Sequence, residues 1–342
     1  MSKSIFNQIK ENWDCISKPL DSMGRFEELT AKLGVIQNSI YPKLDKVALL
    51  VLCADNGVVE EGVSQSGQEV TAICARNIAE GNTSAGVMAK ALGIDVLAVD
   101  MGIAVTEEIP DVLDRKIRAG TRNFAKEAAM TWVECQSAIQ TGISLAEDCK
   151  KKYDAVCIGE MGIGNTTTSA AVAAGLLGLS AEEVCGRGAG LSDQGLQRKI
   201  CVVDAAIKKY DLYNKSAHEV LECVGGFDIA GMVGVYLGAK KVGLPVILDG
   251  AISLTAALAA VKMEKDAGHY LIPSHRSREP LAEKICAELG ADFSPLIDGA
   301  MALGEGSGAV MMTGLLRTAL EVYNKALRFG DSGVGQYKRK SK

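Results

Sequence analysis

Four apolar runs constrain the fold of this 342-residue chain more than any other feature. Each is rich in residues that favour β-strands, and each ends in an acidic residue close to a glycine. Because such runs are apolar on both faces, they are typical of strands buried on both sides in a parallel sheet. The runs are VALLVLCADNG at 47–57, IDVLAVDMG at 94–102, YDAVCIGEMG at 153–162 and LPVILDG at 244–250.

Ala-rich segments of helical length lie between these runs. Strands that alternate with helices predict an α/β fold with a parallel sheet. The predicted helical segments are 67–92, 125–150, 165–178, 196–210, 227–241 and 252–264.

Both ends of the chain are predicted to be helical as well. Residues 4–40 form one such region, which SKPLDSMG at 17–24 interrupts, and residues 280–328 form the other. We therefore expect a large α/β domain over 40–280 and a small helical subdomain built from 1–39 and 281–330. Residues 331–342 are predicted to be a disordered tail.

The acidic residues at the ends of the apolar runs predict a binding site. Ligands of open parallel sheets bind outside the carboxyl ends of the strands, where Asp55, Asp100, Glu160 and Asp249 would gather. The alternative is that each Asp-Gly pair only forms a good turn. The sequence leaves open whether Asp55, Asp100, Asp228 and Asp249 act in chemistry or only in turns.

Glycine-rich turns that lead into helices predict a phosphate site. GEMGIGNTTTSAAVAAGLLG at 159–178 places Asn165 and three threonines where a helix begins, and free N–H groups there attract anions. Ordinary N-capping is the alternative. GRGAGLSDQGLQRK at 186–199 is a second such turn, with Arg187 and Lys199 as sources of positive charge.

Composition excludes several function classes. The net charge is −5 and the one basic block is YKRKSK at 337–342, so we expect no nucleic-acid partner. There is no signal-peptide pattern and no apolar run long enough for a membrane span. The ten cysteines form no CxxC pair, so we expect no metal site, and we expect buried, reduced thiols in a cytoplasmic protein.

The segment MALGEGSGAV at 301–310 contains an unusual carboxylate. Glu305 stands among glycines and apolar residues, where burial would cost free energy unless something compensates. A plain turn would more readily contain Asn, Asp or Ser. Glu305 is therefore a candidate functional residue.

Several long motifs, in order, resemble one enzyme family. GEMGIGNTTTSAAVAAG, VGGFDIAGMVGVYLGAKKVGLPVILDG, YLIPSHRS and LGEGSGA are similar to motifs of the nicotinate-nucleotide–dimethylbenzimidazole phosphoribosyltransferases. The resemblance runs from KPLDSMGRFEEL at 18–29 to about Tyr323. It implies a Rossmann-like domain with a small helical domain, a homodimer and no cofactor. It also implies transfer of phosphoribose from nicotinate mononucleotide to an aromatic lower-ligand base of cobamides, with inversion at C1′.

The resemblance also implies roles for individual residues. Glu305 matches the general base, and Glu160 matches an acid near the leaving nicotinate and ribose. The residues that match the nucleotide and phosphate site are Gly162, Asn165, Thr166, Thr167, Gly188 and Lys199. The residues that match or border the base pocket are Ser66, Cys74, Met161, Ala302 and Leu303.

The sequence departs from the family pattern close to the acceptor. Ala302 stands where arginine is usual, Gly67 replaces proline, Cys74 replaces a glutamine that faces the base, and Asn56 replaces histidine. These changes leave a phenol- or p-cresol-accepting heterodimer, or a non-catalytic partner subunit of one, as alternatives. A dinucleotide oxidoreductase is disfavoured because no GxGxxG follows the first strand. His275, in the PSHRS turn, is predicted to be structural.

Overall fold

A six-stranded parallel sheet in the order β3-β2-β1-β4-β5-β6 forms the centre of the molecule, in a computed structural model that describes residues 4–339. This confirms the predicted α/β class. The predicted runs became four of the strands, whereas two strands of two residues each were not predicted. The strands are β1 (Val47–Ala54), β2 (Asp95–Gly102), β3 (Leu113–Asp114), β4 (Ala155–Met161), β5 (Val246–Ile247) and β6 (Leu271–Ile272).

The strand order places a crevice beside β1. The first strand of the sheet in the sequence is β1. The next two, β2 and β3, lie on one side of it, and β4, β5 and β6 lie on the other side. This is the usual order of a dinucleotide-binding sheet, whose ligands lie where the direction of winding reverses. The reversal here lies between β1 and β4, which pair in parallel from Val47 opposite Ala155 to Cys53 opposite Met161.

Strand β1 is buried on both faces because its side chains alternate between two cores. Leu50 and Leu52 face one hydrophobic cluster, while Leu49 and Val51 face the other. The period of two in strand side chains produces this division. An apolar run without polar alternation is therefore what this position requires.

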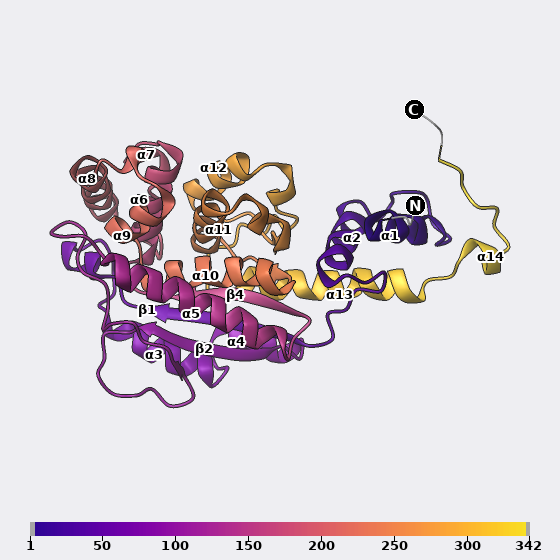
Figure 1. Cartoon of the computed structure of the whole chain (residues 1–342), viewed down its shortest axis with the longest axis horizontal. Coiled ribbons are helices and arrows are strands. Elements are labelled where there is room, and N and C mark those ends of the chain that lie inside the picture. Colours follow the sequence, from indigo (N-terminus) through magenta and orange to yellow (C-terminus); the bar gives the residue numbers. More distant parts are fainter. Residues whose placement is uncertain (1–3, 340–342) are drawn as a thin grey trace.

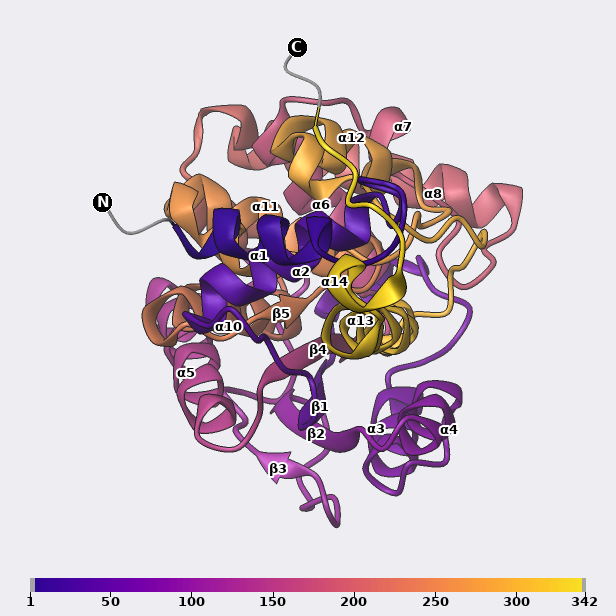
Figure 2. The same cartoon turned by 90° about the vertical axis from the view of Figure 1, so that its right-hand side faces the viewer.

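Helices α5 (Trp132–Lys150) and α10 (Phe227–Val242) cover one face of the sheet and lie side by side in Figure 1. Glycines permit this close approach, since a Cβ atom on Gly234 would overlap the carbonyl oxygen of Ile139. The opposite face is covered by α3 (Glu69–Ala79), α4 (Ser84–Ala91) and α13 (Ser307–Lys325), which Figure 2 shows on the other side of the strands.

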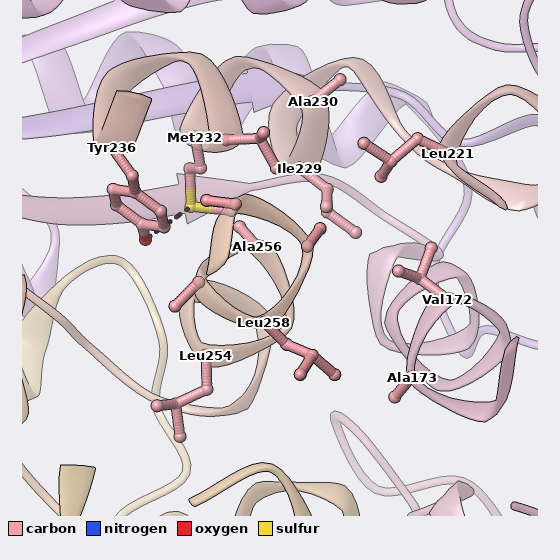
Figure 3. Packing of buried hydrophobic residues seen from close by; sticks show 14 of the residues in the cluster. Val172, Ala173, Leu221, Ile229, Ala230, Met232, Tyr236, Leu254, Ala256 and Leu258 are labelled. Carbon is pink, nitrogen blue, oxygen red and sulfur yellow. Dashed lines mark hydrogen bonds between the residues drawn. The ribbon is translucent and has the colours of Figure 1, made fainter. Parts of the chain in front are cut away.

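A further group of helices packs outside α10. Figure 3 shows Leu258 of α11 (Ala251–Met263) on the side of that helix toward Val172 and Ala173 of α6 (Asn165–Leu177) in this core. The remaining elements are α7 (Ala181–Val184), α8 (Asp193–Tyr210), α9 (Ala217–Val224), α12 (Pro280–Leu289), η1 (Gly57–Glu61), η2 (Leu212–Asn214), η3 (Lys265–Tyr270) and η4 (Ala291–Phe293).

Both ends of the chain meet in one small helical cluster. Trp13 of α1 (Ile5–Asp14) packs against Tyr323 near the end of α13, with ring centroids 5.1 Å apart, beside α2 (Arg25–Gln37). Figure 1 shows these helices at one end of the molecule. After α14 (Phe329–Ser332), residues 333–339 have no regular structure, and Arg339 pairs with Asp14 and Asp21. The tail predicted at 331–342 begins inside α14, and its last residues, 340–342, lie outside the described residues. The domain boundaries stay a prediction.

Three details differ from the sequence-based predictions. Residues 67–92 are two helices, because a turn at Gly81 separates α3 from α4. Residues 280–328 are not continuously helical, since a loop with only the short η4 joins α12 to α13. Cys15 and Cys201 are exposed rather than buried, although all ten cysteines are free thiols. No helix within residues 4–339 is long and apolar enough to cross a membrane.

Candidate active site

The acidic residues at the carboxyl edge of the sheet divide into two groups. Asp55 accepts a hydrogen bond from the Ala104 N–H (2.8 Å), and Asp100 binds the Ile103 N–H (2.8 Å) and the Lys116 ammonium (3.2 Å). Both carboxylates therefore anchor loops. Glu160 and Asp249 instead line a cavity of about 230 Å³ beside the reversal between β1 and β4.

The cavity brings together most of the predicted site residues. Its wall also contains His275, Ser277, Glu279 and Arg187. The predicted residues that line it are Glu160, Met161, Gly162, Asn165, Thr166, Gly188, Ala302, Leu303 and Glu305. Thr167, Lys199, Ser66 and Cys74 do not line it.

Glu305 lies on a loop whose backbone conformation is strained. Its φ is 58°, and it stands between Gly304 at 84° and Gly306 at 85°. A non-glycine residue in this region costs about 1–3 kcal/mol and is held there only by its surroundings. Gly159 of β4 supplies the space, because a Cβ atom there would lie 2.6 Å from the Glu305 carbonyl. The loop therefore rests directly on the sheet.

Asp249 anchors this loop through hydrogen bonds to its backbone. Its two carboxylate oxygens accept hydrogen bonds from the N–H groups of Gly306 (3.1 Å) and Gly308 (2.8 Å), which flank the start of α13. Burial raises the pKa of Asp249, and the nearby His275 ring acts in the opposite direction, with Nδ1 3.8 Å from Oδ1. Asp249 thus positions Glu305 through the backbone. The Glu305 carboxylate reaches the first turn of α4, where the Ala85 N–H lies 3.4 Å from Oε2.

Glu160 is a buried acid that holds its proton at neutral pH. Burial and then the negative charge of Asp228 raise its pKa to about 8. The Asn165 amide donates to Glu160 and also to Asp228 (3.1 Å), so one amide joins the two carboxyl groups. Burial raises the pKa of Asp228 to about 6. A protonated Glu160 can donate a hydrogen bond to a ligand without adding negative charge.

The first glycine-rich turn forms one side of the cavity. Gly162 passes so close to the Ala54 carbonyl that a side chain would overlap it, and Gly164 has a φ of 93° just before α6. Thr166 lines the cavity near the start of α6. Thr167 is fully buried in the core and does not face the cavity. Exposed N–H groups at such a start attract anions.

The second turn lies beside the first. Gly188 has a φ of 52°, and the fully buried Lys199 of α8 lies behind it. The Lys199 ammonium donates to the Thr166 hydroxyl (3.0 Å) and to the Gly186 carbonyl (3.0 Å), so it bridges the two turns. Burial lowers the pKa of Lys199. Arg187, at the rim, pairs with Asp193.

Of the predicted base-pocket residues, only Met161, Ala302 and Leu303 line the cavity. Leu303 is 50% exposed, and Ser66 is exposed in the loop after η1. Cys74, on α3, is half-buried, and burial together with the charge of Glu305 raises the pKa of its thiol. Cys74 therefore lies near Glu305 although it does not line the cavity.

Sequence reasoning missed some of the cavity wall. His275 was predicted to be structural, and it is buried against Gly308; it also lies at the cavity, which was not predicted. Glu279 and Ser277 follow β6, which was too short to be predicted, so no strand pattern pointed to them. Within residues 4–339, no group of three His, Cys, Asp or Glu side chains is placed to hold a metal ion.

Known proteins resemble this chain over nearly its whole length. A phosphoribosyltransferase family model matches residues 1–334. The nicotinate-nucleotide–dimethylbenzimidazole phosphoribosyltransferase of Acetivibrio thermocellus is 42% identical over 98% of this chain and 95% of its own. The crystal structure of CobT from Thermus thermophilus has a TM-score of 0.91 at 36% identity, covering 97% of this chain and 99% of its own. The chain therefore belongs to the nicotinate-nucleotide–dimethylbenzimidazole phosphoribosyltransferase family.

Proposed function

We propose that this enzyme transfers phosphoribose from nicotinate mononucleotide to a benzimidazole-type base, giving an α-riboside 5′-phosphate and nicotinate for cobamide assembly. The observation that carries the proposal is Glu305, held on a strained loop at a cavity that two glycine-rich turns also border. Those turns suit the phosphate, and the apolar residues near Glu305 suit a planar ring.

In the proposed reaction, Glu305 is the general base. The lone pair of one azole nitrogen forms the new bond to C1′ as the bond from C1′ to nicotinate breaks, and nicotinate leaves with that electron pair. The proton on the other azole nitrogen passes to the Glu305 carboxylate. Attack opposite the leaving group converts the β-riboside into the α-riboside.

Glu160 has a different task in this proposal. Because its pKa is about 8, it is mostly protonated at neutral pH and donates a hydrogen bond to the ribose or the leaving group. A second full negative charge would repel the phosphate and carboxylate of the substrate. In this proposal Glu305 accepts a proton, and Glu160, which is neutral, donates a hydrogen bond.

A phenolic acceptor is the second candidate. Ala302 lines the cavity without the usual arginine, and Cys74 lies near Glu305 in place of glutamine. A phenol has no second nitrogen to be recognised, so a less polar pocket suits it. Such an enzyme would work as a heterodimer with a similar chain.

A competition assay separates these candidates. The purified chain receives nicotinate mononucleotide with equal amounts of dimethylbenzimidazole, phenol, p-cresol and adenine, and mass spectrometry identifies the products. We expect the benzimidazole riboside phosphate, and its loss in a Glu305→Gln variant. Phenolic products would instead assign the chain to the phenol branch. No product from any base would contradict catalysis by the isolated chain and would favour a partner subunit.

We propose that the enzyme works as a homodimer through an apolar surface on α13, α4 and α3. Met311 and Leu315, one turn apart on α13, are 44% and 43% exposed. Val87 of α4 is 57% exposed and Ile73 of α3 is 53% exposed, and these helices pack against the same face of the sheet. Exposed apolar patches of this kind support a protein interface.

A further inference from the structure

Glu279 is a cavity residue to which neither the sequence nor the proposed reaction gives a role. It is the last residue before α12, and its half-buried side chain reaches the second glycine-rich turn. Glu279 and Gly188 are 91 residues apart in the chain. A contact between such distant segments, at the expected phosphate site, calls for a physical explanation.

The Glu279 carboxylate occupies the groups that an anionic ligand would use. Its Oε1 accepts a hydrogen bond from the Gly188 N–H at 3.0 Å. Its Oε2 lies against Gly186, where a Cβ atom would overlap it. Burial lowers the pKa of Lys199, and the negative charge of Glu279 is the main influence that raises it. Glu279 therefore contacts the turn and interacts electrostatically with the buried Lys199 ammonium behind it.

This arrangement is incomplete as a purely structural contact. Oε2 is buried and has no hydrogen-bond partner among the described residues. A buried carboxylate oxygen without a partner costs free energy, so a structural acid would be expected to have both oxygens paired. The contact therefore leaves one carboxylate oxygen of Glu279 unsatisfied.

A phosphate at this turn would compete with the Glu279 carboxylate for the Gly188 N–H group. Gly188 has a single N–H, and two anions in contact near a protein surface repel strongly. Glu279 stands at the start of a helix and is only half-buried, so its side chain can rotate toward solvent.

We propose that Glu279 is a resident anion that occupies the phosphate subsite of the empty enzyme and is displaced by the substrate's 5′-phosphate. It keeps the turn at 186–188 and the Lys199 side chain in place until the ligand arrives. The inference rests on the proposed function, because it assigns the phosphate to this turn. Glu279 is thus a positioning residue that lowers phosphate affinity.

The test is a Glu279→Gln variant, which keeps the shape and the acceptor oxygen but loses the charge. We expect inorganic phosphate and nicotinate mononucleotide to bind at least about tenfold more tightly in calorimetric titrations, since a repelling charge is removed. Nicotinate riboside, which lacks the phosphate, should show no gain. The matched control is Glu283→Gln, because Glu283 is an exposed acid of the same helix that pairs with Arg276.

The outcomes separate this inference from the proposed function. The inference requires tighter phosphate binding, which damage to the fold would not produce. Unchanged or weaker phosphate binding in Glu279→Gln would therefore overturn the resident-anion role. An equal gain for the riboside would overturn it too. The wild-type protein used in the binding titrations is also assayed for turnover. If phosphate binding tightens but no acceptor is converted, the proposed function fails while the role of Glu279 stands.

Discussion

At the residue scale, Glu305 combines a rare backbone conformation with an anchored loop. Its positive φ costs free energy, and the two hydrogen bonds from the loop to Asp249 stabilise the conformation. Strain that surrounding contacts maintain is common at functional sites. The backbone at Glu305 is therefore held in place, which suits its proposed role as general base.

Replacing Glu305 with Gln should remove catalysis but not binding. Gln cannot accept a proton, so we expect the turnover rate to fall by about 10²- to 10⁴-fold. Affinity for nicotinate mononucleotide should change little. Glu321→Gln, an exposed position on α13 that pairs with Lys325, is the control and should keep full activity. A Glu305→Gln variant with normal turnover would exclude the base role.

Glu160 should make the enzyme less stable as the pH rises. Its pKa is raised from 4.5 to about 8 in the folded state. Between these values the folded enzyme holds a proton that the unfolded chain has lost, so the free energy of unfolding falls with increasing pH. Asp228, with a pKa raised to about 6, acts in the same direction over a lower range.

A Glu160→Gln variant should therefore be more stable than the wild type at pH 8. Gln resembles the protonated acid, and the expected gain is roughly 1–4 kcal/mol at pH 8, shrinking toward zero near pH 4.5. Thermal unfolding at both pH values measures it. Glu182→Gln, at an exposed position of α7, should show no such pH-dependent gain. A variant that is equally destabilised at both pH values would contradict a protonated Glu160.

At the element scale, glycines set the distance between α5 and α10. Gly234→Ala would place a Cβ atom on the Ile139 carbonyl and push the helices apart. We expect a loss of about 1–3 kcal/mol, as for other overpacked cores, measured by denaturant unfolding. Gly330→Ala, which adds the same atom in open space within α14, should be neutral or slightly stabilising. Equal effects at both positions would refute the packing explanation.

Elements with a long and distinct sequence pattern were predictable, and short or irregular ones were not. β1 and β4 could be predicted because burial on both faces demands an unbroken apolar run. β3 and β6 contain only two residues each, too few to show a period. The loop at 290–306 was predicted as helix, although its glycines and the positive φ of Glu305 prevent one.

The site was predictable only where motifs stand close together in sequence. Glu160 and Asn165 share one turn, and the resemblance to a known family identified Glu305. Glu279 follows β6 and meets Gly188, 91 residues earlier in the chain, only in the folded structure. The contact depends on tertiary structure, so neither residue's sequence neighbourhood indicated it.

At the scale of the whole molecule, α13 connects the candidate site to the small helical cluster that contains α1 and α2. Its first residues follow Glu305, and near its end the Tyr323 hydroxyl donates to the Ile40 carbonyl (2.9 Å) and accepts from Asn12 (2.9 Å). Its middle carries the exposed residues of the proposed dimer surface. An interface on α13 would therefore stabilise the helix that follows Glu305, the proposed general base.

A charge on this surface should separate the proposed dimer. Leu315→Glu places a carboxylate at its centre, where burial in an interface would be costly. We expect the molar mass from analytical ultracentrifugation to fall from that of two chains to that of one. Val35→Glu, on the exposed side of α2, is the control and should remain dimeric. Since α13 begins at the Glu305 loop, turnover of the Leu315→Glu variant shows whether the site is complete within one chain. A wild type that is monomeric at all concentrations would refute the interface.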